Sequence, residues 1–285
     1  MQTAAVDDPA HRIEEIILAH GTRGMDRIRG SIIPGYCTRA AQIILENRGK
    51  VLIGTGFPVN GLSETDGPVG AISLYRVLEA LGSEPVLFCA PPLSHILKPH
   101  YKTYEMPIWP WEETRRVVQS VLEAFDPCLL VAVEQPGVAE DGRYYNMNGQ
   151  DISGSVAKFD LFFELCDCPT VAFGDGGNEI GMGNVYETLS SLPVIPSITC
   201  CDELVIATVS NWGVYGVIAA MSRLMGRDLL GDVDPESAMV YLVANGCVDG
   251  VTSLSVHTED GLPLAIGISV IEQLRETLRG GLINE

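Results

Sequence analysis

Basic residues are scarce in this chain. Its 285 residues include 18 Lys and Arg against 37 Asp and Glu, which gives a formal net charge of −19, and no lysine follows Lys158. Phosphate recognition needs clustered Lys and Arg side chains, so this composition argues against a nucleic-acid partner. An acidic surface also repels anionic small molecules unless a bound cation reverses the local field.

Long apolar runs are also missing. No run reaches the roughly 18 residues that a transmembrane helix requires, and the densest stretch, 214–225, is interrupted by Gly216, Ser222 and Arg223. The first thirty residues do not follow the pattern of a signal peptide, and they hold too many acids for an ordinary transit peptide. We therefore expect a cytoplasmic protein that has no membrane partner.

Zinc, redox and triad motifs are missing as well. The eight cysteines lack CxxC spacing, and Cys89, Cys128 and Cys200 lie in or beside apolar runs, where cysteine behaves as a small hydrophobe. We expect reduced thiols rather than disulfides or a metal cluster. No serine occupies a nucleophile elbow and no histidine lies in a catalytic pattern, so any chemistry must rest on carboxylates and a metal ion.

The sequence does contain short apolar runs that alternate with helical patterns. Its 46% hydrophobic content is typical of a globular protein with a sizeable core, and no linker divides the chain. This alternation predicts an α/β fold, a mainly parallel sheet with helices on both faces. We expect one domain over residues 1–285, with 1–25 as a helical N-terminal extension. Strands are predicted at 50–56, 85–90, 128–134, 169–174 and 203–208, helices at 11–19, 67–81, 111–125, 155–165, 212–225, 235–244 and 264–278, and a loop at 26–34.

Glycines and acids concentrate in the loops after four of these strands. Ligands of parallel sheets bind outside the carboxyl ends of the strands, which is where such loops lie. The loop at 174–183 holds five glycines in ten residues, and Asp175, Asn178 and Glu179 supply oxygen atoms within it. Hard divalent cations take such ligands. The alternative is a glycine-rich turn with solvated polar side chains.

Three more carboxylates lie at strand ends or helix starts. Glu64 and Asp66 precede a helix that begins with Pro68. Asp66 either caps that helix or joins Glu64 in facing a bound cation or a substrate ammonium group. Glu134 ends an apolar strand, where a carboxylate is costly unless it is paired or binds a metal.

Other polar and aromatic residues suggest ligand contacts. Arg143 is one of few cations near these loops, and it either binds a substrate carboxylate or is solvated. Ser210 and Asn211 start a helix, which they cap, or they bind an anion at its N-terminus. The segment 91–111, rich in proline and aromatic residues, predicts a homo-oligomer interface or a lid over the site.

Several of these motifs, taken in order, resemble the D-glutamate cyclase family. The resemblance extends from about Asp26 to Leu262, and the loop at 174–183 is its most specific part. It implies a carbon–oxygen lyase that converts D-glutamate to 5-oxo-D-proline with loss of water. The stretches that carry the resemblance are 29–35, 55–59, 64–68, 141–146, 174–183, 210–213 and 248–251.

This reaction defines roles for the candidate residues. The substrate α-amine must attack its own γ-carbonyl carbon, and the γ-carboxylate is a poor electrophile while it is charged. A divalent cation would neutralise that charge, and a second carboxylate would act as a base. We therefore predict Glu64, Glu179 and Asp175 as catalytic residues, Asp175, Glu179, Glu134 and Asp66 as ligands of Mg²⁺, Mn²⁺ or Ca²⁺, and Arg143, Asn146, Asn178, Ser210 and Asn211 as contacts of the amino-acid substrate.

Two other functions fit the same residues. One is metal-dependent hydrolysis of a small phosphorylated or amide metabolite on the acidic loops. The other is a non-catalytic module that binds an amino acid or a metal, which predicts thermal stabilisation by the ligand without turnover. The acids could also simply cap helices and order the glycine turns.

Overall fold

A six-stranded parallel sheet forms the centre of the protein in the computed structural model, which describes residues 9–21 and 23–279. The strand order is β5-β4-β1-β6-β7-β8, and every neighbouring pair is parallel. The α/β fold class predicted from the sequence is therefore confirmed. The strands are β1 (Lys50–Thr55), β4 (Glu84–Cys89), β5 (Thr103–Glu105), β6 (Leu129–Val133), β7 (Thr170–Gly174) and β8 (Glu203–Ile206).

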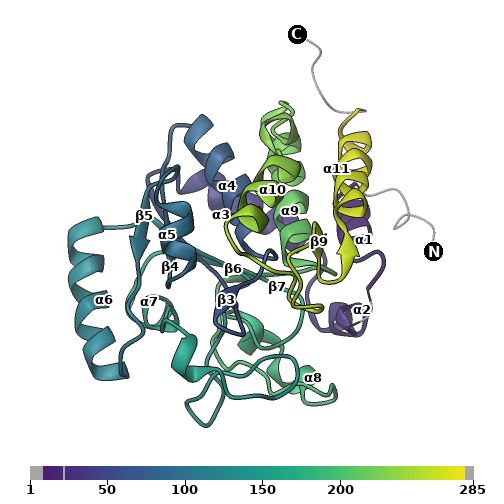
Figure 1. The fold of residues 1–285 in the computed structure, drawn as a ribbon. Helices are drawn as coiled ribbons and strands as arrows, with labels where there is room; N and C mark the ends of the chain where they lie inside the picture. The colour runs from purple at the N-terminus through teal and green to yellow at the C-terminus, as the bar shows by residue number, and fades with distance from the viewer. Residues whose placement is uncertain (1–8, 22, 280–285) are drawn as a thin grey trace.

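Helices cover both faces of this sheet (Figure 1). Helices α3, α4 and α9 lie on one face and contact the strands, and α1, α10 and α11 pack against them. Helices α6 and α7 pack together on the other face. The helices are α1 (Pro9–Ile17), α2 (Met25–Ile28), α3 (Tyr36–Glu46), α4 (Pro68–Ala80), α5 (Leu93–Leu97), α6 (Trp111–Phe125), α7 (Asp160–Leu165), α8 (Tyr186–Leu189), α9 (Ser210–Met225), α10 (Pro235–Ala244) and α11 (Leu264–Leu278).

Two short hairpins complete the elements around the sheet. One joins β2 (Pro58–Val59) to β3 (Leu62–Ser63), and the other joins β9 (Thr258–Glu259) to β10 (Leu262–Pro263). The first hairpin follows β1 and the second precedes α11, so the two hairpins lie far apart in the sequence.

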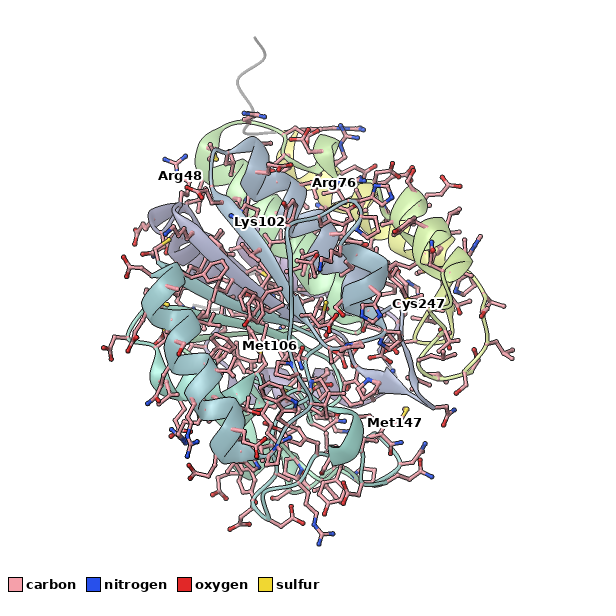
Figure 2. The ribbon with its side chains drawn as sticks, turned by 60° about the vertical axis from the view of Figure 1, so that its left-hand side comes forward. Arg48, Arg76, Lys102, Met106, Met147 and Cys247 are labelled. Carbon is pink, nitrogen blue, oxygen red and sulfur yellow. The ribbon has the colours of Figure 1, made fainter. Side chains whose placement is uncertain are left out.

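The buried apolar side chains form one cluster that includes residues from both helical layers (Figure 2). Met106, for example, is 1% exposed inside it, whereas Met147 is 41% exposed at the surface. Helix α1, which belongs to the predicted extension 1–25, contributes Ile13 and Ile17, both fully buried. The described part of that extension is thus packed into the core; residues 1–8 and 22 lie outside the described residues.

The five predicted strands are all present, but several other elements are not predicted from the sequence. Helices α3 and α5 and strand β5 are additions, and the predicted loop at 26–34 contains α2 and a 3₁₀ turn. Helix α7 begins at Asp160, five residues later than predicted. The three-residue β5 and the five-residue α5 are too short to show a hydrophobic period.

The aromatic residues of segment 91–111 are mostly used within the chain. Tyr104 stacks on Phe88, with ring centroids 4.9 Å apart, and Trp111 stacks on Tyr144 at 6.0 Å. Trp109 is 47% exposed. Intramolecular packing therefore accounts for much of the aromatic concentration that suggested an interface. Homo-oligomerisation stays a prediction, and sedimentation velocity is the measurement that checks it.

Candidate active site

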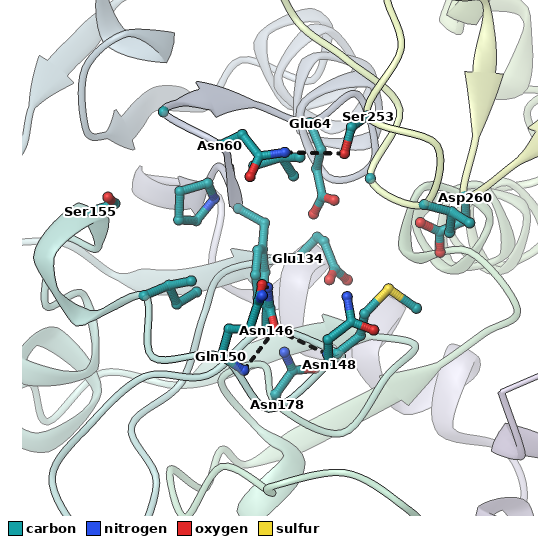
Figure 3. Close-up of a pocket in the computed structure, with 18 of the residues that line it drawn as sticks. Asn60, Glu64, Glu134, Asn146, Asn148, Gln150, Ser155, Asn178, Ser253 and Asp260 are labelled. Atoms are coloured by element: carbon teal, nitrogen blue, oxygen red, sulfur yellow. Dashed lines mark hydrogen bonds between the residues drawn. The ribbon is translucent and has the colours of Figure 1, made fainter.

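A cavity of about 490 Å³ opens at the carboxyl ends of the strands, where the sequence predicts the site. The loops after β1 and β6 form part of its wall, and the β9–β10 hairpin closes one side. Figure 3 shows the carboxylates of Glu64 and Glu134 near its centre and Asp260 at its edge. Asp66, Asp175 and Glu179 are not among the residues that line this cavity. They are fully or almost fully buried behind it.

Glu64 is the carboxylate most available to a ligand. It follows β3, lines the cavity and is 6% exposed. Its side chain accepts no hydrogen bond from any residue that the structure describes. Burial raises the pKa of the Glu64 carboxyl well above its usual range, and the nearby Asp260 and Asp66 carboxylates raise it further. A buried, unpartnered acid with a raised pKa has the properties of a general base or acid.

Glu134 occupies a strained position directly after β6. Its φ angle of 46° is in the left-handed region, which is uncommon for residues other than glycine and clusters at functional sites. Its Oε2 accepts a 2.5 Å hydrogen bond from the Ser210 hydroxyl. Burial and the neighbouring Glu179 carboxylate raise the pKa of Glu134 well above its usual range. Both the backbone conformation of Glu134 and the burial of its carboxylate therefore cost free energy in the folded state.

The N-termini of α4 and α9 are capped reciprocally. The Asn211 Oδ1 accepts from the backbone N–H groups of Gly67 and Gly70 at 2.9 and 2.7 Å, at the start of α4. The Asp66 carboxylate accepts from the N–H groups of Asn211 and Ser210 at 2.9 and 3.1 Å, at the start of α9. Ser210 and Asn211 therefore do not cap their own helix, because the neighbouring acid reaches it first. Neither residue lines the cavity; they hold the acids in place.

Replacing Asn211 with Ala should lower the free energy of unfolding by about 1–3 kcal/mol. The side chain is fully buried, and besides its two cap bonds it donates to Glu259 at 2.8 Å. Gly70 N–H and one Glu259 oxygen therefore lose a partner, whereas Gly67 N–H keeps its bond to Asp66. Urea denaturation measures the change. Asn245→Ala is the matched control, because that exposed residue makes a single bond to the Tyr241 carbonyl oxygen. Equal losses in the two variants would contradict the reciprocal-cap interpretation.

The glycine-rich loop after β7 is held by its own acid. The two Glu179 oxygens accept from the N–H groups of Gly176 and Gly177 at 2.8 and 2.7 Å. Asn178 donates to the Tyr145 carbonyl oxygen at 2.8 Å and lines the cavity. Glu179 therefore orders the turn, which is one of the two roles that the sequence left open for it.

Arg23 and Asp260 belong to the site, although neither was predicted from the sequence. The Arg23 Nη1 lies 2.7 Å from Asp175 Oδ1, and its Nη2 pairs with Asp260. Among the described residues that line the cavity, Arg23 is the only cation. The acidic turn at 259–261 is visible in the sequence, but no local pattern marks Arg23, which lies 152 positions from Asp175.

Arg143 lies outside the cavity. Its side chain is 60% exposed, with nitrogen–oxygen distances of 3.9 Å to Asp141 and 3.6 Å to Asp151, and it is not among the lining residues. Nearby surface acids hold the guanidinium outside the cavity, and the predicted contact with a substrate carboxylate stays a prediction. Asn146 does line the cavity, but its Oδ1 accepts from backbone N–H groups of its own loop.

The buried acids form two groups that could hold a metal ion. Each group has three carboxylates whose oxygens lie within 4.8 Å of one another, and Asp175 belongs to both. Burial raises the pKa of Asp66 to about 6 and raises that of Asp175 well above its usual range, although Arg23 opposes the shift at Asp175. Such a donor set of oxygens suits Mg²⁺, Mn²⁺ or Ca²⁺. The groups are Asp66, Asp175 and Asp260, and Glu134, Asp175 and Glu179.

The fold and the site together define an α/β protein with a carboxylate-lined cavity at the strand ends. A family described as D-glutamate cyclase-like, C-terminal, matches residues 13–275, and the chain belongs to that family. The mitochondrial D-glutamate cyclase of Homo sapiens is 33% identical over 211 residues, which cover 64% of this chain and 34% of the human one. This chain thus spans about a third of the length of that relative.

The described helices include none that is both long and apolar enough to cross a membrane. The human relative is named as mitochondrial. A cytoplasmic location for this chain stays a prediction.

Proposed function

We propose that this protein converts D-glutamate to 5-oxo-D-proline with loss of water. Membership of the D-glutamate cyclase-like family supports the reaction class. The observation that carries the proposal is Glu64, a nearly buried carboxylate without a hydrogen-bond partner among the described residues, which faces a cavity beside two possible cation sites. Intramolecular lactam formation needs such a base together with neutralisation of the γ-carboxylate.

Glu64 is assigned to proton transfer. The substrate α-ammonium group must lose a proton before its nitrogen can attack the γ-carbon, and Glu64 can accept it. A pKa raised above the usual carboxyl range brings this base closer to neutral pH, where general catalysis is most effective. The protonated Glu64 then donates to the departing oxygen. The second proton that the α-nitrogen loses also ends on this oxygen, which leaves as water. Asp175 and Glu179, also predicted as catalytic, lie behind the cavity and take a supporting role.

The group of Glu134, Asp175 and Glu179 is assigned to a divalent cation. When bound, the cation would neutralise the γ-carboxylate and stabilise the oxyanion. Glu134 is the member of this group that also lines the cavity, so it connects the buried acids with the substrate space. The Ser210 hydroxyl fixes one oxygen of Glu134, and Arg23 fixes one oxygen of Asp175.

Incubation of the purified protein with D-glutamate should yield 5-oxo-D-proline above the spontaneous rate, and EDTA should suppress the yield. Chiral chromatography with Mg²⁺ or Mn²⁺ present is the measurement, and L-glutamate is the stereochemical control. Absence of product above the spontaneous rate under all metal conditions would remove the proposal. Hydrolysis of a phosphorylated metabolite is less well supported, because the one lining cation among the described residues, Arg23, is held by Asp175 and Asp260.

A further inference from the structure

We propose that the cavity also accepts glutamate derivatives whose γ-carboxyl group is an amide, and that it releases 5-oxoproline from them together with the amine. The substrate class is a γ-glutamyl amide of D-configuration, up to the size of a dipeptide. This inference rests on the proposed cyclisation, since the same α-amine attacks the same γ-carbon. It concerns the part of the cavity that Asn148 and Gln150 line.

The cavity is larger than free glutamate requires. Its volume is about 490 Å³, within the range of roughly 300–1,000 Å³ that is typical of sites for drug-sized ligands. Glutamate has only about ten non-hydrogen atoms, well below that ligand size. A substrate placed with its γ-carbon near Glu64 leaves the volume toward the opening free. A group attached to the γ-carbon would extend into that space.

The wall carries two kinds of polar side chain (Figure 3). The acids Glu64 and Glu134 lie near the centre of the cavity and Asp260 lies at its edge. The part of the wall away from these acids, called the outer wall here, carries neutral carboxamide and hydroxyl groups, which donate and accept hydrogen bonds without carrying charge. It also holds one acid, Asp151, and several apolar side chains. These groups match the N–H and C=O of an amide link and of a following residue. They belong to Asn60, Asn146, Asn148, Gln150, Ser155 and Ser253.

Two carboxamides in this outer wall have hydrogen-bonding atoms to spare. The Asn148 side chain has no hydrogen-bond partner among the described residues. The Gln150 Oε1 accepts from Asn146 at 2.9 Å, while its Nε2 has no such partner. Asn146 itself holds the loop, because its Oδ1 accepts from the backbone N–H groups of Asn148 and Gln150. Asn148 and Gln150 therefore line the cavity on a braced loop and keep donors and acceptors free for a ligand.

The charge around Glu64 and Glu134 favours an amide over a second carboxylate. Four lining acids meet one lining cation, Arg23, and that cation is already paired with Asp260 and with Asp175. The acids are Glu64, Glu134, Asp151 and Asp260. The γ-carbon of a γ-amide carries a neutral group instead of a carboxylate, so that part of the ligand experiences less repulsion there; in γ-D-glutamylglycine the second carboxylate lies further out, on the glycine. The amide carbonyl carbon is also a better electrophile than that of a carboxylate anion.

The reaction balances without any co-reactant. The α-nitrogen forms a bond to the γ-carbon, and the bond from that carbon to the amide nitrogen breaks. Glu64 accepts a proton from the α-ammonium group and returns it to the leaving nitrogen. The second proton that the α-nitrogen loses also ends on the leaving nitrogen, which departs as an ammonium ion. The products are 5-oxoproline and the protonated amine, and no water is consumed or released.

Parallel incubations with D-glutamate, D-glutamine and γ-D-glutamylglycine test the proposal. We expect 5-oxo-D-proline from all three, with matching ammonia or glycine from the amides, and a kcat/KM for the dipeptide at least tenfold above that for D-glutamate. The rate without protein is subtracted from each rate, and the Glu64→Gln variant is the inactive control. Product from D-glutamate alone would overturn this inference and leave the proposed function standing. Absence of 5-oxo-D-proline from all three substrates would overturn both proposals. If γ-D-glutamylglycine yields glycine and D-glutamate but no 5-oxoproline, the reaction is hydrolysis, which would overturn the cyclisation of amides.

The double variant Asn148→Ala/Gln150→Ala tests the outer wall separately. We expect the ratio of kcat/KM for γ-D-glutamylglycine to that for D-glutamate to fall roughly three- to tenfold, the effect of about one lost hydrogen bond. Both positions are exposed, so the melting temperature should stay the same. Gln119→Ala, at an exposed position on α6, is the matched control and should leave the ratio unchanged. An unchanged ratio in the double variant would overturn the assignment of the outer wall.

Discussion

Replacing Glu64 with Gln should lower kcat for 5-oxo-D-proline formation by about 10²–10⁴-fold while it stabilises the fold. The activity falls because glutamine cannot accept the proton of the α-ammonium group. The stability rises because Glu64 is 6% exposed and lacks a hydrogen-bond partner among the described residues, so its charged form is costly and a neutral isostere removes that cost. We expect a gain of about 1–3 kcal/mol at pH 8 without metal.

The gain should depend on pH in a definite direction. The pKa of Glu64 is raised in the folded protein, so at pH 5 the native carboxyl already carries its proton and the substitution changes little. At pH 8 the native protein must either keep that proton against the solution pH or bury a charge. Urea denaturation at both pH values measures this. Exposed Glu46→Gln is the control, and a Glu64→Gln variant that is active, or less stable at pH 8, would contradict the assignment.

Without metal, the protein should become less stable as the pH rises from 5 to 8, and Mn²⁺ or Mg²⁺ should restore the stability. Burial raises the pKa of Asp66 to about 6 and that of Glu259 to about 7, and it raises the pKa of Glu134 and Asp175 well above the usual range. The unfolded chain has carboxyl pKa values near 4, so the folded state holds more protons over this interval. Unfolding therefore releases protons, and stability falls with rising pH.

A cation that binds only the folded state adds about 2.7 kcal/mol at 100 times its Kd. Thermal unfolding at pH 5, 6, 7 and 8, with EDTA and then with MnCl₂, measures both effects. A stability that is flat or rises with pH in EDTA would contradict the account of the buried acids.

Asp175→Asn should remove the metal-linked stabilisation, because this carboxylate belongs to both groups of possible ligands. Exposed Asp232→Asn, whose carboxylate lies 3.8 Å from Arg227, is the matched control and should keep the stabilisation. Glu179→Gln should also lose it, but this change loosens the contacts to Gly176 and Gly177 as well, so Asp175→Asn is the sharper test. Full metal response in Asp175→Asn would show that the ion binds elsewhere or not at all.

The sequence by itself determined the fold class and the edge of the sheet at which the site lies. Apolar runs such as those of β1 and β6 are buried along their length, so their pattern reports burial directly. Because all strands of a parallel sheet end on one side, the acids that follow them, Glu134 and Asp175, had to converge. The nearby helix start brought Glu64 to the same edge.

Only the tertiary structure decided which side chains meet there. Arg23 reaches Asp175 and Asp260 across most of the chain, and no local period encodes such a contact. The residue type also does not determine in which direction a side chain points. Glu179 turns back to its own loop, and Arg143 stays among surface acids. The physical reason is that periodicity depends on burial and on nearby backbone bonds, whereas a polar side chain takes whichever partner the packed loops bring within reach.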